Sequence, residues 1–194
     1  MQKDKSRRTE ILEKAAYLFH KKGYAATSIR DIAREIGMES ASLYNHIKSK
    51  QEILQAHLLP LAQRYVKGIN EIEVSPLSSI QKLERIIGDQ VRITIENTDG
   101  VSLIPTEWVH LDGGTLQEFI GLRNDYEKTF KTILEQAIDD GFLKKVDVEI
   151  ATFSILSTLR MLFSWYSKNK DVNPLALENE LVMNLIGGMK NGKQ

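Results

Sequence analysis

The sequence contains no cysteine and only four prolines among its 194 residues. Without cysteine it can form no disulfide, no cysteine-based zinc site, no iron–sulfur cluster and no thiol nucleophile. It has no apolar stretch near the roughly 18 residues that a membrane-spanning helix needs, and its start lacks the apolar core of a signal peptide. Apolar residues still make up 42% of the chain, which is enough for a hydrophobic core. We therefore expect a folded cytoplasmic protein with no membrane partner.

The net charge of the chain is zero, but the charge is unevenly distributed. Residues 1–50 carry eleven Lys and Arg against six Asp and Glu, a net charge of +5. The other 144 residues carry fifteen basic and twenty acidic side chains, a net charge of −5. A basic N-terminal part favours contact with a polyanion such as nucleic acid, although an imbalance of this size also arises by chance.

Apolar residues recur at steps of three and four along most of the chain, which predicts an all-α fold of about nine helices. The change in composition near residue 50 divides it into an N-terminal three-helix domain, 1–49, and a C-terminal helical domain, 50–194. We expect helices over residues 5–22, 28–36, 40–47, 50–71, 77–97, 115–140, 147–168 and from 174 onward, with a loop and one short helix over 99–114.

Residues 28–47 have the features of a helix-turn-helix. Ser28 is an N-cap candidate, and Asp31 three residues later completes a capping box. Ala33 is small enough for a second helix to cross closely, and Gly37 tolerates the backbone conformation of a tight turn. Two short helices at this spacing are typical of modules that insert the second helix into the major groove. The alternative is an ordinary all-α fold in which these helices only pack.

The outer face of the second helix in this module carries short or planar side chains, which suit base edges and phosphates. Lys48 and Lys50 follow at the start of the next helix, where ammonium groups and backbone N–H groups can both bind a phosphate. The residues of the outer face are Ser40, Ala41, Ser42, Tyr44, Asn45 and His46.

The run from Thr27 to Met38, followed by Ser42-Leu43-Tyr44-Asn45-His46-Ile47-Lys48-Ser49-Lys50, resembles the N-terminal module of the TetR family of transcriptional regulators. The resemblance covers about residues 7–54 without gaps. It implies an all-helical homodimer, a DNA-binding module in each subunit, and a C-terminal body that binds a small molecule and thereby relieves repression.

The resemblance also implies roles for individual residues. It makes Tyr44 a contact to the DNA backbone and bases, and Arg30 a base contact from the first helix of the module. Each has an alternative, which is partial packing for Tyr44 and pairing with Asp31 or Glu35 for Arg30. His46, which could instead brace the next helix, matches a backbone contact, as do Lys50, Thr27 and Ser28, whereas Ser40, Ala41 and Ser42 match positions that set the operator sequence.

Residues 147–168 form a helix that is apolar on nearly every side, so each face needs a packing partner. One face can pack on its own subunit. The other is expected to pack, with the last helix of the chain, on the same two helices of a second subunit in a four-helix interface. The alternative is a fully internal helix in a monomer.

Aromatic and soft residues spread over three segments could enclose an apolar ligand, although each could equally be ordinary core. Arg123 and Arg160 lie in apolar surroundings, where a guanidinium needs an anionic partner. That partner could be Asp125, Glu127 or an acidic ligand. The candidates are Trp108, Phe119, Tyr126, Phe130, Phe153 and Met161, of which Trp108, Phe119 and Tyr126, with the two arginines, form the expected pocket.

Residues 103–170 are similar to TetR regulators of lipid and aromatic-acid metabolism, which implies an acyl-coenzyme A thioester or another hydrophobic effector. Where several of those regulators have an Asn-Trp pair, this chain has Leu159-Arg160.

Two other functions remain open at this stage. One is a helical regulator controlled by a protein partner. The other is a metal-dependent helical enzyme that uses Glu107, His110 and Asp112, although di-metal helical sites need such a Glu-x-x-His motif twice. We expect neither catalytic residues nor a cofactor or metal site.

Overall fold

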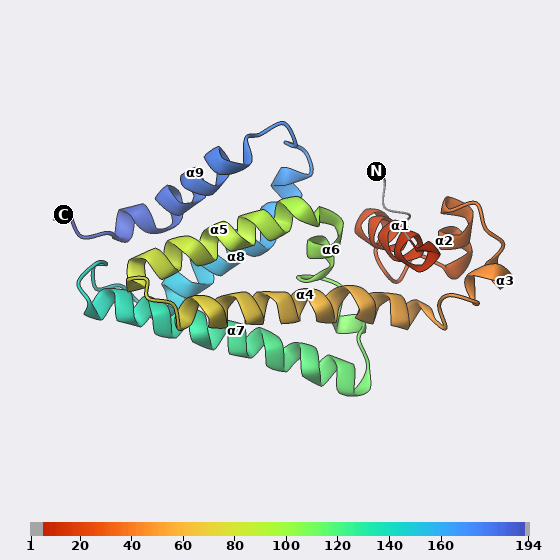
Figure 1. The fold of residues 1–194 in the computed structure, drawn as a ribbon, viewed down its shortest axis with the longest axis horizontal. Coiled ribbons are helices and arrows are strands. Elements are labelled where there is room, and N and C mark those ends of the chain that lie inside the picture. The colour runs from red at the N-terminus through yellow and green to blue at the C-terminus, as the bar shows by residue number, and fades with distance from the viewer. Residues whose placement is uncertain (1–5, 193–194) are drawn as a thin grey trace.

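The computed structural model describes residues 6–192 and is helical over most of that range. Three helices form a small N-terminal head, and the others form an elongated body (Figure 1). The helices are α1 (Arg7–Lys22), α2 (Ile29–Glu35), α3 (Ser40–Leu43), α4 (Lys50–Glu73), α5 (Ser79–Glu96), α6 (Thr98–Leu103), α7 (Gly113–Asp139), α8 (Val148–Tyr166) and α9 (Pro174–Ile186), with short 3-10 turns η1 (Trp108–His110) and η2 (Gly187–Met189).

Local sequence signals set the ends of the helices in the head. The hydroxyl of Ser28 accepts the backbone N–H of Asp31, whose carboxylate accepts the backbone N–H of Ser28 in return, so that the expected capping box opens α2. Gly23 ends α1 with φ of +83°, and Gly37 follows α2 with φ of +65°. Both conformations are strained for any residue with a Cβ, which explains glycine at the two turns.

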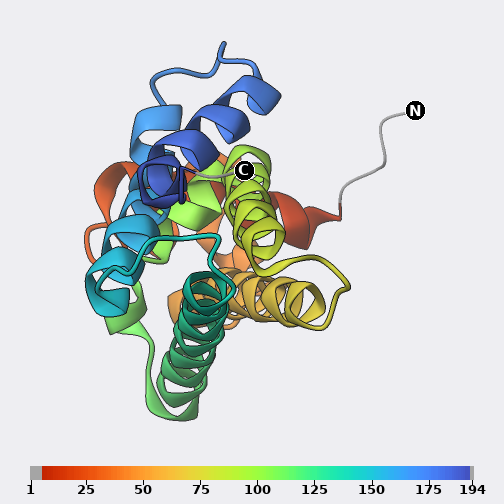
Figure 2. The ribbon, with the colours of Figure 1, turned by 90° about the vertical axis from the view of Figure 1, so that its left-hand side faces the viewer.

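The body is built around α4 and α7, which lie side by side along its length, with α5 and α8 packed above them (Figures 1 and 2). Helix α9 packs on α5 at the edge of the body. The core between α5, α7 and α8 contains Ile87, Phe130 and Leu156, each at most 1% exposed. In the part of the chain that the structure describes, no helix is long and apolar enough to cross a membrane.

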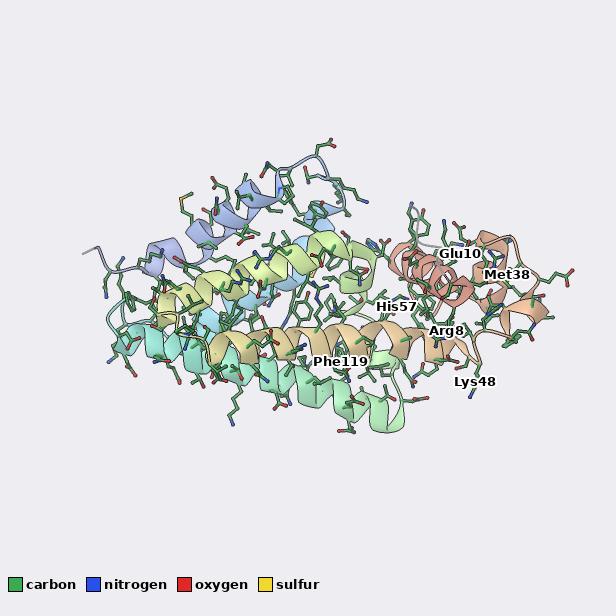
Figure 3. The ribbon with its side chains drawn as sticks, viewed as in Figure 1. Arg8, Glu10, Met38, Lys48, His57 and Phe119 are labelled. Carbon is green, nitrogen blue, oxygen red and sulfur yellow. The ribbon has the colours of Figure 1, made fainter. Side chains whose placement is uncertain are left out.

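The head shares a hydrophobic core with the near end of the body. Ile11 and Phe19 of α1 belong to the same buried cluster as Leu58 of α4, Leu103 of α6 and Phe119 of α7. Figure 3 shows His57 and Phe119 at this junction, on either side of α4. Because the core is continuous, α1 packs directly on α4 and α6, and a displacement of either helix would change the position of the head relative to the body.

Two segments differ from the sequence-based expectation. Helix α3 ends at Leu43 rather than near residue 47, and the chain continues in turns held by bonds such as the one from the backbone N–H of His46 to the Leu43 carbonyl. The segment 99–114 is more ordered than expected, with both α6 and η1. Asn97 opens α6, because its side-chain oxygen accepts the backbone N–H of Gly100.

Candidate functional site

Helix α3 and the turn after it form an exposed polar surface of the head. Ser42 and Tyr44 are solvent-accessible, and Tyr44 is 55% exposed. Leu43 and Ile47 point the other way and are at most 1% exposed, which anchors this surface on the core of the head. Ala41, Asn45 and His46 are also exposed, and Ser40 is half-buried.

Basic side chains flank this surface on both sides. Arg30 on α2 is exposed, and the carboxylates proposed as its partners are engaged elsewhere, since Asp31 pairs with Arg34 and Glu35 with Lys14. Lys48 is exposed immediately before α4 and points away from the protein in Figure 3. Arg30 and Lys48 are therefore accessible cations beside α3.

Ser28 and Thr27 are used within the head. The Ser28 hydroxyl donates to Asp31 at 2.5 Å, and this bond, with the bond from the backbone N–H of Ser28, lowers the pKa of Asp31 to about 2. Thr27 is 1% exposed, and its hydroxyl donates to the Gly23 carbonyl at 2.9 Å. The loop before α2 is thus fixed by its own side chains, and the Thr27 hydroxyl does not face solvent.

Lys50 also points inward, unlike Lys48. Its ammonium donates to the Tyr24 carbonyl at 2.8 Å and to the Thr27 carbonyl at 2.9 Å, and it lies 4.1 Å from the centroid of the Tyr24 ring. Partial burial lowers the pKa of Lys50, an effect that the charge of Glu107 opposes. The sequence signal for Lys50, a cation near a helix start, does not distinguish this arrangement from an outward one.

The body contains a mostly apolar cavity of about 70 Å³ between α4, α5, α7 and α8. Four of the five residues expected in the pocket line it: Phe119, Arg123, Tyr126 and Arg160. Of the other aromatic candidates, Phe130 is fully buried in the core, whereas Phe153 and Met161 lie on the surface, 71% and 51% exposed.

The fifth expected residue, Trp108, lies one layer behind the cavity. Its ring stacks on Phe119 with centroids 6.3 Å apart, and the guanidinium of Arg123 lies 4.7 Å from the Trp108 ring centroid. Arg160 donates to Glu127 at 3.2 Å, so its partner is one of the carboxylates named from the sequence, although both side chains are half-buried rather than internal. Arg123 is held by an aromatic face rather than by Asp125 or Glu127.

Three lining residues join the cavity to a larger cleft. Tyr65, Gln90 and Tyr126 border both, and the Gln90 amide donates to the Tyr126 hydroxyl at 2.6 Å. Burial raises the pKa of both tyrosines, so that they remain neutral phenols at every physiological pH. The two spaces therefore share a border of polar but neutral side chains.

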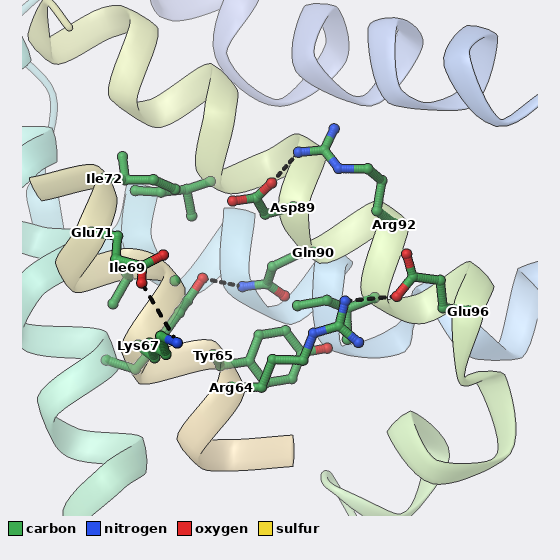
Figure 4. A pocket seen from close by; sticks show the side chains of 14 residues that line it. Arg64, Tyr65, Lys67, Ile69, Glu71, Ile72, Asp89, Gln90, Arg92 and Glu96 are labelled. Atoms are coloured by element: carbon green, nitrogen blue, oxygen red, sulfur yellow. Dashed lines mark hydrogen bonds and ion pairs between the residues drawn. The ribbon is translucent and has the colours of Figure 1, made fainter. Parts of the chain in front are cut away.

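The cleft between α4 and α5 measures about 310 Å³ and has a charged rim (Figure 4). Arg64 pairs with Glu96 at 2.6 Å, and Lys67 lies 3.8 Å from Glu71. Arg92 pairs with both Asp89 of α5 and Glu178 of α9. Every basic group named here already has an acidic partner.

The sequence interpretation missed Tyr65 and Gln90. Gln90 is 8% exposed on a face of α5 that otherwise carries Ile86, Ile87 and Ile93. A polar side chain in such an apolar stripe needs a buried hydrogen-bond partner, and this was an available signal. The cavity-lining residues not expected from sequence are Ala62, Tyr65, Gln90, Val101, Ile104, Leu122 and Leu159.

An apolar surface runs along α8 and α9. Ile150, Phe153, Met161 and Trp165 lie on one side of α8 by helical spacing and are 48–71% exposed. Leu175 and Met183 extend the apolar surface onto α9 at 65% and 58% exposure.

The residues of the possible metal site have other contacts. Glu107 and His110 lie 3.5 Å apart, and the Gln55 amide donates to Asp112 at 3.4 Å. Across residues 6–192 no three His, Asp or Glu side chains are grouped so that they could hold a metal ion.

Two family models match the chain. One, described as bacterial regulatory proteins of the tetR family, matches residues 11–57, and a second, described as a tetracyclin repressor-like C-terminal domain, matches residues 76–189. The chain belongs to the TetR family. It is therefore a DNA-binding transcriptional regulator and not an enzyme, and TetR regulators typically act as homodimers that bind small-molecule effectors.

Similar proteins support this assignment over nearly the whole chain. The HTH-type transcriptional repressor KstR2 of Rhodococcus jostii RHA1 is 30% identical over 189 residues, covering 94% of this chain and 91% of that protein. KstR2 of Mycolicibacterium smegmatis is 26% identical, with coverage of 95% and 91%. The structure of the ketosteroid regulator KstR2 of Mycobacterium tuberculosis has a TM-score of 0.89 at 24% identity, covering 97% of each chain.

A further TetR-fold structure is that of AibR in complex with isovaleryl coenzyme A and operator DNA. It matches with a TM-score of 0.76 at 22% identity and covers 92% of this chain and 97% of that one.

Proposed function

We propose that the chain is a transcriptional repressor that binds a palindromic operator as a homodimer and leaves it when a hydrophobic, acyl-coenzyme A-type effector enters the body. The observation that carries the DNA-binding half is the exposed face of α3, with Ser42 and Tyr44 outward and Leu43 and Ile47 buried beneath them. The similar KstR2 proteins are named as repressors, which supports repression rather than activation.

The DNA interface that we propose is narrower than the set of residues that the family resemblance implies. Ala41, Ser42, Tyr44 and the half-buried Ser40 face the major groove, and Arg30 reaches the DNA from α2. His46 and Lys48 contact the phosphates on one side of the groove. Ser28 and Thr27 act by fixing the start of α2, because both hydroxyls already bond within the head.

The dimer that we propose pairs α8 and α9 of one subunit with the same helices of a second. The support is the stripe of exposed apolar residues along both helices, since a surface of this kind is costly to leave in water. A two-fold axis through this surface would make the interface self-complementary and would present two heads to successive major grooves.

The effector site that we propose is the cavity between α4, α5, α7 and α8. Its volume of about 70 Å³ is below the range of about 300–1,000 Å³ typical of ligand pockets, so an acyl chain must push the helices apart. This enlargement favours a change in the position of the heads. Arg123 and Arg160 at the lining suit the carbonyl or acid group of such a ligand, and AibR supplies the precedent of an acyl-coenzyme A bound to the same fold.

The proposed DNA binding is tested by letting the purified protein select duplexes from a random pool. Enrichment of a palindrome, bound with an affinity that falls steeply as salt rises, is the expected result. Binding that shows no preference over random DNA would overturn the proposal.

Thermal unfolding with a series of acyl-coenzyme A thioesters, beginning with isovaleryl-coenzyme A, tests the effector half. A ligand of the folded state raises the melting temperature by mass action. The proposed site requires that Arg160→Gln reduce this rise and that the bound thioester weaken binding to the selected duplex. If no thioester shifts the melting temperature, control by a protein partner becomes the better explanation.

A further inference from the structure

A group of contacts joins the loop before α2 to the turn η1 next to the cavity. The ring of Tyr24, in that loop, stacks on His110 of η1 with centroids 5.1 Å apart. The Tyr24 hydroxyl donates to the Gln51 side chain at 2.8 Å, and the Gln51 amide donates to the His110 carbonyl at 2.8 Å. Tyr24 is therefore tied to η1 both directly and through the first turn of α4.

Lys50 closes this group from the other side. Its ammonium lies over the Tyr24 ring and donates to the carbonyls of Tyr24 and Thr27, the residues that bracket the loop. Two of the three N–H donors of the ammonium are used by these bonds, which leaves one free. Ser28, the N-cap of α2, follows immediately after Thr27, so Lys50 fixes the point at which α2 starts.

The far side of η1 contacts the wall of the cavity. Trp108, two residues before His110, stacks on Phe119 and lies beneath Arg123, and both of these residues line the cavity. A ligand that displaces Arg123 or Phe119 would therefore move the Trp108 ring, which the three-residue turn η1 connects to His110. The contact runs from the cavity to the head without passing along α4.

We propose that Tyr24, Lys50 and His110 form a latch between the cavity wall and the DNA-binding head, and that Lys50 supports DNA binding through this latch instead of by contacting a phosphate. The proposal rests on the proposed function for its link to an effector, but its Lys50 part requires only DNA binding. Lys50 is in this sense a positioning residue for α2 and α3.

The salt dependence of operator binding distinguishes a lysine that contacts a phosphate from a lysine that only positions α2 and α3. Each phosphate contact contributes about 0.9 to the slope of log K against log salt, so losing one reduces the slope by about that amount. Lys48→Met, the matched control at an exposed lysine, should reduce the slope by about two, because the homodimer loses one phosphate contact in each of its two heads. Lys50→Met should weaken binding to the selected duplex by about fivefold or more at every salt concentration and leave the slope unchanged. A slope reduced by about two in Lys50→Met would overturn the proposal.

Fluorescence of Trp108 tests the latch without any effector. The chain has two tryptophans, so Trp165→Phe, which keeps an aromatic side chain on the exposed face of α8, leaves Trp108 as the only one. The affinity of this variant for the selected duplex is first compared with that of the unmodified protein. Because coupling between two sites is reciprocal, binding of the selected duplex should change the emission of Trp108. His110→Ala in the same background should bind the duplex more weakly, because the latch is broken, and should lose the change in emission when the duplex is saturating.

The outcomes distinguish failure of the latch from failure of the proposed function. If no duplex is selected from the random pool, the proposed function fails. If the duplex binds but Trp108 emission stays constant, or if His110→Ala retains the full change, the latch is wrong and the DNA-binding role stands. Thermal unfolding of each variant confirms that it is folded before either measurement is interpreted.

Discussion

At the scale of single residues, the burial of Leu43 and Ile47 decides which side chains of the head face solvent. Tyr44 and Ser42 are exposed as expected, because Leu43 and Ile47 take up the inward positions of the same turn. Lys48 and Lys50 have the same side chain two residues apart, yet one points to solvent and the other bonds to two carbonyls of a loop more than twenty residues earlier. That difference depends on the fold of the loop and not on the lysine.

Tyr44→Ala should weaken binding to the operator by about 1–3 kcal/mol, the range of one good contact to a base edge. Since Tyr44 is 55% exposed, the melting temperature should hardly change. Titration of labelled operator measures the first effect and calorimetry the second. An unchanged operator affinity would contradict the assignment of α3 as the recognition helix.

His57 should make the stability of the protein depend on pH below neutrality. Burial lowers the pKa of its imidazole, and its Nε2 bonds to the Leu12 carbonyl at 2.8 Å. Because the unfolded chain takes up a proton near pH 6.5 and the folded chain only at lower pH, the folded state loses stability as pH falls from about 6.5 towards the pKa of the folded form.

His57→Gln keeps a donor for the Leu12 carbonyl but cannot be protonated. Its free energy of unfolding, measured with urea at several pH values, should fall less than that of the unmodified protein between pH 7 and 5. Parallel curves for the two proteins would show that His57 makes no such contribution.

At the scale of elements, caps and glycines in the sequence predict most helix boundaries correctly. The remaining boundaries depend on tertiary contacts. Ser28, Ser49 and Asn173 each cap a helix that the sequence predicts. The segment 98–110 was less predictable because its glycine and proline are typical of loops. Its order comes from contacts to other elements, such as the bond from His20 of α1 to Asp99 of α6 at 2.7 Å.

Ser28→Ala should lower the free energy of unfolding by about 1 kcal/mol, since it removes the side-chain acceptor at the start of α2. Ser28→Asn, which keeps an acceptor, should recover most of that loss. Urea unfolding measures both values. Equal stability of the alanine variant and the unmodified protein would show that the cap is dispensable in this head.

At the scale of the whole molecule, a shared core connects the head to the body. Ile11 of α1 and Phe119 of α7 belong to one buried cluster. The hydrophobic packing therefore continues across the predicted boundary between residues 49 and 50. Such packing lets an event in the body alter the setting of the head, as repression relieved by an effector requires.

Phe153→Asp should convert the protein to a monomer and reduce operator affinity, because a two-fold interface would bury the new carboxylate of each subunit. Val74→Asp is the matched control, since Val74 is 83% exposed at the end of α4. Analytical ultracentrifugation at micromolar concentration measures the mass of each variant. A Phe153→Asp variant that remains dimeric would exclude α8 as the centre of the interface.

The sequence by itself determined the all-α class, the helix-turn-helix and its outward face, because these follow from periodicity, caps and glycines within a few residues of one another. It also identified four of the five residues that it placed at the cavity. Only the tertiary structure decided that Lys50 faces a loop, that Trp108 lies behind the cavity and that Tyr65 and Gln90 line it. Each of these depends on segments that are distant along the chain, whose meeting no local pattern encodes.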